Sequence, residues 1–332
     1  MHRSDEVPLE ALVPGLDQFR FVPLDVAHHC VDLASAAGQL RTLPEHVAAL
    51  VVRGLPCGTD PERGLLFDPA DLMNLGRASR TGRTHSEVVW RYLMGFSAGS
   101  SREWLAAKDW MITLRLPDHG SGCFRVRVPD WTAAGITRLP APGLRLPAPD
   151  VEFSTDGYQV AVRVAGEFDE VRDPRARDVY RDMLDELEAG RVGYQCVAEP
   201  LRLDHHRAWE LGMADCIVVS RVIADRFREL GLTARARRGF LPGPVGSEHA
   251  WCEIYEDSRW KTVDVGFAFR FHVLPSGQRP PQTDEFVAAC FGSRFNRLVP
   301  CAAPDATSIL YENSEPRTML LALVAGSNWK DS

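Results

Sequence analysis

Apolar residues recur at helical spacing in three stretches of the chain. Between Cys216 and Leu230 they occupy positions 217, 219, 223, 227 and 230, which form one face of a helix that Gly231 ends. Residues 68–96 show a similar spacing, and residues 174–187 alternate between a polar and an apolar helical face. The pattern therefore predicts a helix over each stretch, and the first of these places Cys216 in its first turn.

Alternation with a period of two predicts strands elsewhere in the chain. Two adjacent segments, 110–116 and 123–128, are expected to pair with each other, because Asp118, Gly120 and Gly122 supply a turn. Hairpins are expected from 151–153 with 159–164 and from 250–255 with 259–265, and a strand from 234–241. Helices combined with antiparallel strands predict the α+β class.

A proline-rich segment marks the expected domain boundary. Residues 138–149 contain the unit Arg-Leu-Pro-Ala-Pro twice, and so many prolines fit neither a helix nor a central strand. We therefore expect an N-terminal α+β extension over residues 1–150 and a catalytic domain over residues 151–332. The extension has no chemical motif of its own, and we expect it to help shape the substrate groove of the catalytic domain.

Composition limits the class of protein. The chain has 332 residues, 45% of them hydrophobic and 25% charged, and a net charge of −7, which argues against a nucleic-acid binder. It shows no secretion signal and no membrane-spanning apolar run, so we expect no membrane association and a cytoplasmic location with its eight cysteines reduced. The histidines at 28, 29, 205 and 206 lack zinc-site spacing, so neither a metal nor a cofactor is expected.

Three residues could form a catalytic triad. His249 follows Cys216 by 33 positions, and Asp264 follows His249 by 15. A thiol is a strong nucleophile only as the thiolate; an imidazole can take its proton, and a carboxylate can orient that imidazole. Because His249 and Asp264 fall on neighbouring predicted strands, the hairpin itself would bring them close together.

The motifs around these residues resemble the transglutaminase-like superfamily, whose core has papain-like chemistry. The matching segments are Gly212 to Cys216, Leu230-Gly231-Leu232-Thr233-Ala234-Arg235, His249-Ala250-Trp251 and Trp260 to Asp264. The resemblance implies a cysteine-bearing helix packed on an antiparallel sheet that carries the His and the Asp. It also implies that Cys216 is the nucleophile, His249 the base and Asp264 the group that orients it.

The sequence departs from the protein-crosslinking members of that superfamily at several positions. Ile217 stands where they have Trp after the Cys, Asp215 adds a negative charge before it, and Val265-Gly266 replaces the common Pro-Thr. These departures argue against protein crosslinking and leave acyl transfer through a thioester.

We expect Cys216 to form an amide on an amine, from a thioester or amide donor, in small-molecule biosynthesis. A cysteine peptidase or amidase, with water as acceptor, and a catalytically silent binding domain remain the alternatives. The expected partner is a small-molecule or acyl-carrier-bound substrate, and the oligomeric state is open.

Further residues are candidates for contacts with the substrate. Gln195, Trp209 and Trp251 could supply an oxyanion donor or a pocket wall. Arg235, Arg237 and Arg238 form a basic cluster in an acidic chain and could dock an acidic carrier.

Overall fold

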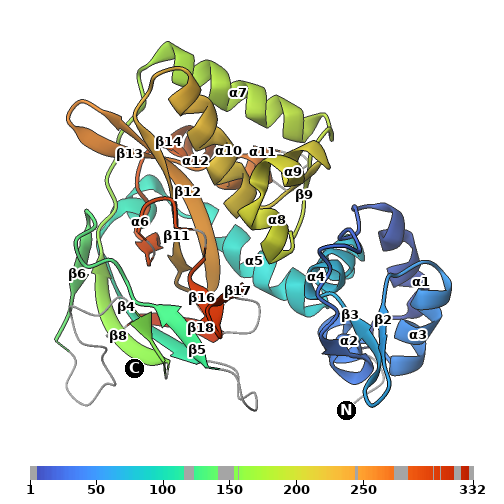
Figure 1. The fold of residues 1–332 in the computed structure, drawn as a ribbon. Helices are drawn as coiled ribbons and strands as arrows, with labels where there is room; N and C mark the ends of the chain where they lie inside the picture. Colours follow the sequence, from blue (N-terminus) through green and yellow to red (C-terminus); the bar gives the residue numbers. More distant parts are fainter. Residues whose placement is uncertain are drawn as a thin grey trace. The chain divides into compact units, whose positions relative to one another are not determined.

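The computed structural model of the chain contains α-helices and mainly antiparallel sheets, so the predicted α+β class is confirmed (Figure 1). The residues that it describes are 6–115, 123–140, 153–155, 157–243, 246–272, 283–301, 303–306, 308–317 and 323–328. Most of the proline-rich segment, from residue 141 to residue 149, falls outside these ranges, as does the turn expected between 116 and 122. Within the described ranges, every helix is too short or too polar to cross a lipid bilayer.

The chain divides into two compact units, and the division differs from the expected boundary at residue 150. The first unit combines Met1–Leu93 with Val192–Asp215, and the second combines Met94–Arg191 with Cys216–Ser332. The physical reason is strand pairing: β4 (Lys108–Arg115) and β8 (Tyr158–Val164) pair antiparallel from Lys108 opposite Val164 to Leu114 opposite Tyr158. Residues on both sides of position 150 therefore build one sheet.

The first unit is built from short helices around a small antiparallel sheet of order β1-β3-β2. Its elements are α1 (Leu9–Leu12), η2 (Val13–Asp17), β1 (Val31–Asp32), α2 (Leu33–Leu40), α3 (Pro44–Val52), β2 (Gly58–Asp60), β3 (Gly64–Phe67), α4 (Pro69–Ala78), the beginning of α5 (His85–Ser97), β9 (Gly193–Tyr194), α8 (Glu199–Leu203), α9 (His205–Glu210) and β10 (Met213–Ala214). The expected helical region 68–96 is thus two helices, α4 and α5. Asp68 accepts a hydrogen bond from Ala70 N and caps α4.

Asp71 of α4 is a buried carboxyl group with an incomplete set of partners. It is 1% exposed; its Oδ1 accepts a hydrogen bond from Val22 N at 3.0 Å, whereas Oδ2 has no partner. Burial raises the pKa of Asp71 to about 7, with a further contribution from the charge of Asp68, although the bond from Val22 opposes the shift. Because the folded-state pKa lies above the unfolded value of about 3.9, this group stabilises the fold below that value, and the contribution is lost as the pH rises through about 7.

Asp71→Asn is therefore expected to stabilise the protein at alkaline pH. The amide keeps the acceptor for Val22 N and cannot ionise, so the free energy of unfolding at pH 8 should rise by roughly 1–3 kcal/mol. At pH 5 the gain should be much smaller. Urea unfolding at the two pH values measures both, with the half-exposed Asp60→Asn as a control that should show no such gain. A gain that is absent at pH 8, or equal at both pH values, would contradict the assignment.

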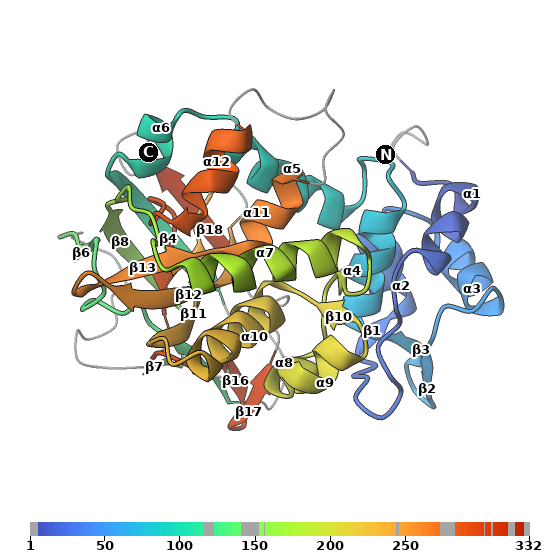
Figure 2. The same cartoon turned by 90° about the horizontal axis from the view of Figure 1, so that it is seen from above.

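The second unit is organised around a central antiparallel sheet of order β14-β13-β12-β11-β15. Its strands are β11 (Ala234–Leu241), β12 (Ser247–Glu256), β13 (Arg259–Val263), β14 (Phe291–Gly292) and β15 (Val299–Pro300). The helices of this unit are α6 (Ser101–Leu105), α7 (Pro174–Glu188), α10 (Cys216–Glu229), α11 (Val265–His272) and α12 (Thr283–Ala289). Helix α10 packs against β11 and β12, with α7 and α11 beside it (Figure 2). The predicted helices over 174–187 and 216–230 and the predicted strand over 234–241 are confirmed.

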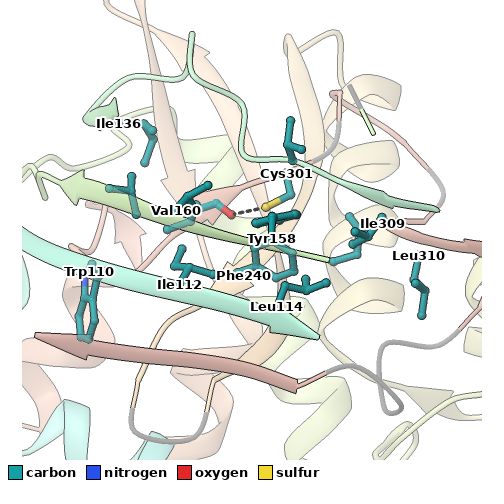
Figure 3. Close-up of a cluster of buried hydrophobic side chains, with 14 of the residues drawn as sticks. Trp110, Ile112, Leu114, Ile136, Tyr158, Val160, Phe240, Cys301, Ile309 and Leu310 are labelled. Carbon is teal, nitrogen blue, oxygen red and sulfur yellow. Dashed lines mark hydrogen bonds between the residues drawn. The ribbon is translucent and has the colours of Figure 1, made fainter. Parts of the chain in front are cut away.

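Two smaller sheets complete the second unit, with orders β18-β4-β8-β6 and β17-β16-β5-β7. Their remaining strands are β5 (Phe124–Arg127), β6 (Ile136–Arg138), β7 (Phe153–Ser154), β16 (Leu310–Glu312), β17 (Glu315–Arg317) and β18 (Leu323–Asn328). Alternate residues of β4 and β8 point into a shared apolar core, where Tyr158 and Val160 meet Phe240 of the central sheet (Figure 3). This core joins all three sheets.

Two of the predicted strand pairings are wrong. The strands β4 and β5 form as expected but lie in different sheets, with β5 paired to β16 and β7. Likewise β7 and β8 do not form a hairpin, because β7 pairs with β5 and β8 pairs with β4 and β6. The alternation showed correctly which faces are buried, but it contained no information about which strand lies alongside.

Candidate active site

Cys216 is the first residue of α10 and is partly exposed. The apolar face of this helix is buried, with Ile217, Val219, Ile223 and Phe227 at most 2% exposed, so the helix is firmly fixed against the sheet. The first turn of a helix has backbone N–H groups without helical partners and the positive end of the helix dipole. Both favour negative charge, so this position suits a thiolate and a developing oxyanion.

The hairpin of β12 and β13 brings His249 and Asp264 together. Its two-residue turn has positive φ at Asp257 and at Ser258, 53° and 63°, which matches the twist of the two strands. Cys252 pairs with Val263 at the end of the ladder. Asp264 follows directly, diagonally across from His249, so the predicted closeness of the two residues results from strand register.

His249 and Asp264 form a short buried hydrogen bond. The distance from His249 Nε2 to Asp264 Oδ2 is 2.6 Å, and the two residues are 2% and 1% exposed. The other carboxylate oxygen of Asp264 accepts a hydrogen bond from Phe267 N at 2.9 Å, which caps α11. Because Nε2 is bound to Asp264, Nδ1 is the imidazole nitrogen left to exchange a proton with a thiol.

The surroundings of His249 favour its charged form. Burial alone disfavours the imidazolium, but the Asp264 carboxylate and a hydrogen bond with the Cys216 side chain outweigh it and raise the pKa of His249 to about 9. At neutral pH the ring is therefore mainly protonated, and it can stabilise a thiolate on Cys216 and then donate its proton to a leaving group.

An aromatic cluster supports the imidazole and was missed in the sequence. The Phe267 ring stacks on His249 with a centroid distance of 4.3 Å and an angle of 14°. Phe267 in turn packs near Phe96, Phe286 and Phe295, with distances of 6.0–6.4 Å between the ring centroids. The sequence signal for it is the spacing of three between Asp264 and Phe267, typical of a carboxylate that caps a helix; the strand predicted over 259–265 conceals this signal.

The other candidates for substrate contact lie in different surroundings. Trp251 is 2% exposed, and its ring lies 6.2 Å from that of His249. Gln195 and Trp209 belong to the first unit. The Gln195 amide accepts a hydrogen bond from Arg20 N at 3.0 Å and donates one to Arg20 O at 2.6 Å, so an oxyanion role would require it to give up the second bond.

The expected basic cluster on β11 is not a surface patch. Arg237 and Arg238 are 3% and 2% exposed, Arg237 pairs with Asp130 at 2.7 Å, and Arg238 pairs with Glu248. Arg235 pairs with Glu253 at 2.7 Å and lies over the Trp260 ring. The correction has a simple cause: the acidic partners come from segments distant in sequence or from the next strand, so the charges looked uncompensated.

The carboxylate that precedes Cys216 is also paired. Asp215 Oδ2 bonds Arg202 Nε at 2.7 Å, and Arg202 also bonds Glu199 at 3.0 Å. All three residues are at most 6% exposed. The negative charge that departs from the family pattern is therefore held in a buried ion pair.

Comparison with protein families finds a match over part of the chain. Residues 160–265 match the sequence model of the transglutaminase-like superfamily, so this part of the chain carries the transglutaminase-like core. Members of that superfamily are cysteine-dependent enzymes, either transferases or proteases. No curated protein sequence shows a significant match.

Two solved structures are similar to the chain. One is a candidate cysteine protease from Cytophaga hutchinsonii, with 11% identity over 67% of this chain and 88% of that one and a TM-score of 0.34. The other is a TGase, with 16% identity over 54% of this chain and 61% of that one and a TM-score of 0.22.

Proposed function

We propose that the chain catalyses acyl transfer through a thioester on Cys216, with an amine as the final acceptor. The observation that supports this most is the buried 2.6 Å pair of His249 and Asp264, whose remaining imidazole nitrogen is left for the Cys216 thiol. The substrate is a thioester or amide, either small or bound to an acyl carrier, and the product is an amide used in small-molecule biosynthesis.

The reaction would proceed in two steps, formation of the thioester on Cys216 and transfer of its acyl group to the amine. In the first, His249 Nδ1 holds the thiol proton while the Cys216 thiolate attacks the carbonyl carbon; the bond to the leaving group breaks, and the imidazolium protonates that group. In the second, the acceptor amine attacks the thioester, His249 takes its proton, and the bond between carbon and Cys216 Sγ breaks. N–H groups of the first turn of α10 would stabilise the oxyanion in both steps.

Burial of the base supports an amine acceptor over water. His249 is 2% exposed and is covered on one face by Phe267, so bulk water has little access to the nitrogen that would activate it. A shielded base lets the thioester survive until a bound amine arrives. The buried Arg237 and Arg238 favour docking of a carrier elsewhere than on β11.

Intact-protein mass spectrometry with a panel of acyl thioesters tests the proposal. Wild-type protein should gain the mass of one acyl group, whereas Cys216→Ala should gain none. Adding an amine should then remove the adduct and produce the amide. Discharge without amide would indicate a hydrolase instead, and the absence of any adduct across the panel would favour a binding domain.

A further inference from the structure

Two cations in the second unit, Arg297 and Lys108, are held by a rigid local frame; we call them the basic pair. Arg297 follows Asn296, whose side-chain amide donates hydrogen bonds to Glu103 O at 2.8 Å and Ala106 O at 2.6 Å. Trp110, two residues beyond Lys108, donates its indole N–H to Asn296 O at 2.9 Å. The backbone positions of both cations are therefore fixed by the same set of bonds.

Arg297 lies on aromatic rings and has no acidic partner among the described residues. Its guanidinium carbon is 4.5 Å from the Phe96 ring centroid and 5.3 Å from that of Trp110. Its Nε is inaccessible to solvent and makes no hydrogen bond. Burial lowers the pKa of Arg297 to about 10. The Arg297 guanidinium is partly removed from water, and the aromatic rings stabilise its charge without accepting conventional hydrogen bonds. Its N–H donors could therefore bind an anion strongly.

The charge of Arg297 acts on Lys108, which is another cation. Burial and then the charge of Arg297 lower the pKa of Lys108, while Glu103 opposes the shift. The Glu103 carboxylate is already engaged at the start of α6, where it accepts hydrogen bonds from Ser100 N at 2.7 Å and Ser100 Oγ at 3.1 Å. Glu103 therefore attracts Lys108 from a distance, and among the described residues neither member of the basic pair has a carboxylate oxygen within the 4.0 Å of an ion pair.

Three fully buried cations of this unit differ from the half-buried basic pair, because each has an acidic partner. Arg237 pairs with Asp130, Arg238 pairs with Glu248, and Lys261 pairs with both Glu256 and Asp257. Since removing a charge from water without a partner is costly, an anion supplied by a ligand would stabilise two half-buried cations that have no ion pair among the described residues.

We propose that the basic pair binds a phosphate or carboxylate group of a ligand. The Arg297 guanidinium offers two parallel donors to two oxygens of the anion, and the Lys108 ammonium adds a point charge. Phe96 lies beneath Arg297 and also contacts Phe267, the ring stacked on His249. If the proposed acyl transfer is correct, the bound anion is the acidic end of one of its two substrates.

Lysine acetylation tests the binding without any assay of activity. The chain has three lysines, Lys108, Lys261 and Lys330, so each can be followed separately by peptide mass spectrometry. An anion bound beside Lys108 should raise its pKa, and a rise of one unit lowers the fraction of reactive free amine about tenfold. At pH 8 and constant ionic strength, saturating inorganic phosphate or acetate should slow acetylation of Lys108 by about that factor. The buried, ion-paired Lys261 should show no such change.

Variants separate the site from general salt effects. Arg297→Met should abolish the protection, whereas Arg163→Met, which removes an arginine already paired with Asp109, should retain it. Arg297→Lys gives a milder change; it should weaken the protection and reduce the rise in melting temperature that phosphate causes. Protection by phosphate alone would assign a phosphate ligand, and protection by acetate alone a carboxylate. Protection by neither anion, or equal protection in Arg297→Met, would overturn the proposal, whatever the result of the acyl-transfer assay.

Discussion

Replacing Cys216 by Ser is expected to lower kcat by roughly 10⁵-fold or more, the scale seen when the nucleophile of a catalytic triad is removed. A serine hydroxyl is a far weaker acid than a thiol, and the His249 ring is already mainly protonated, with its pKa raised to about 9. It therefore cannot serve as a strong base for an alcohol. Because Cys216 is partly exposed at the start of α10, the fold should not change, which circular dichroism can check.

Alkylation by iodoacetamide at neutral pH provides a second readout of the same prediction. Cys216 should react first, because His249 stabilises its thiolate. Burial raises the pKa of Cys252, Cys290 and Cys301, so these thiols should be nearly inert. Cys123, which is exposed, is the matched control for simple accessibility. Labelling of Cys123 as fast as Cys216, or full turnover in Cys216→Ala, would rule out the nucleophile.

The parts of the site that could be predicted from the sequence are those set by local signals. The helix over 216–230 follows from apolar spacing and the glycine at its end, and the hairpin of β12 and β13 follows from alternation around a short turn. The hairpin alone brings His249 and Asp264 into contact. Family motifs then identified which Cys belongs with them, and the geometry agrees with that choice without testing its role.

The parts that could not be predicted depend on contacts between distant segments. Alternation in β4 and β5 shows which side chains are buried, but the partner strands β8 and β16 lie far along the chain. The charges of Arg237 and Arg238 looked available because Asp130 and Glu248 are not recognisable as partners until the strands are placed. The two compact units could not be predicted for the same reason, because each combines segments that lie far apart in the sequence.

Asp264→Asn is expected to lower kcat by about 10⁴-fold, the effect of the corresponding change in the Ser-His-Asp enzymes. The amide can still accept a hydrogen bond from Phe267 N and so keep the cap of α11, but it no longer stabilises the imidazolium. Without the carboxylate, burial becomes the dominant influence, and the pKa of His249 should fall from about 9 to below its usual value.

The pH profile distinguishes this electrostatic role from a purely structural one. In the wild type, activity should decline as the pH rises through about 9, where the imidazolium that protonates the leaving group is lost. The stability that His249 contributes has the same sign: it is fully present below about 6.5 and is lost as the pH rises through the folded-state pKa. In Asp264→Asn the alkaline limb of kcat/KM should move to lower pH. Asp169→Asn, which changes a carboxylate paired with Arg259, should leave that limb in place. An unshifted limb in Asp264→Asn would show that the carboxylate does not control the protonation of His249.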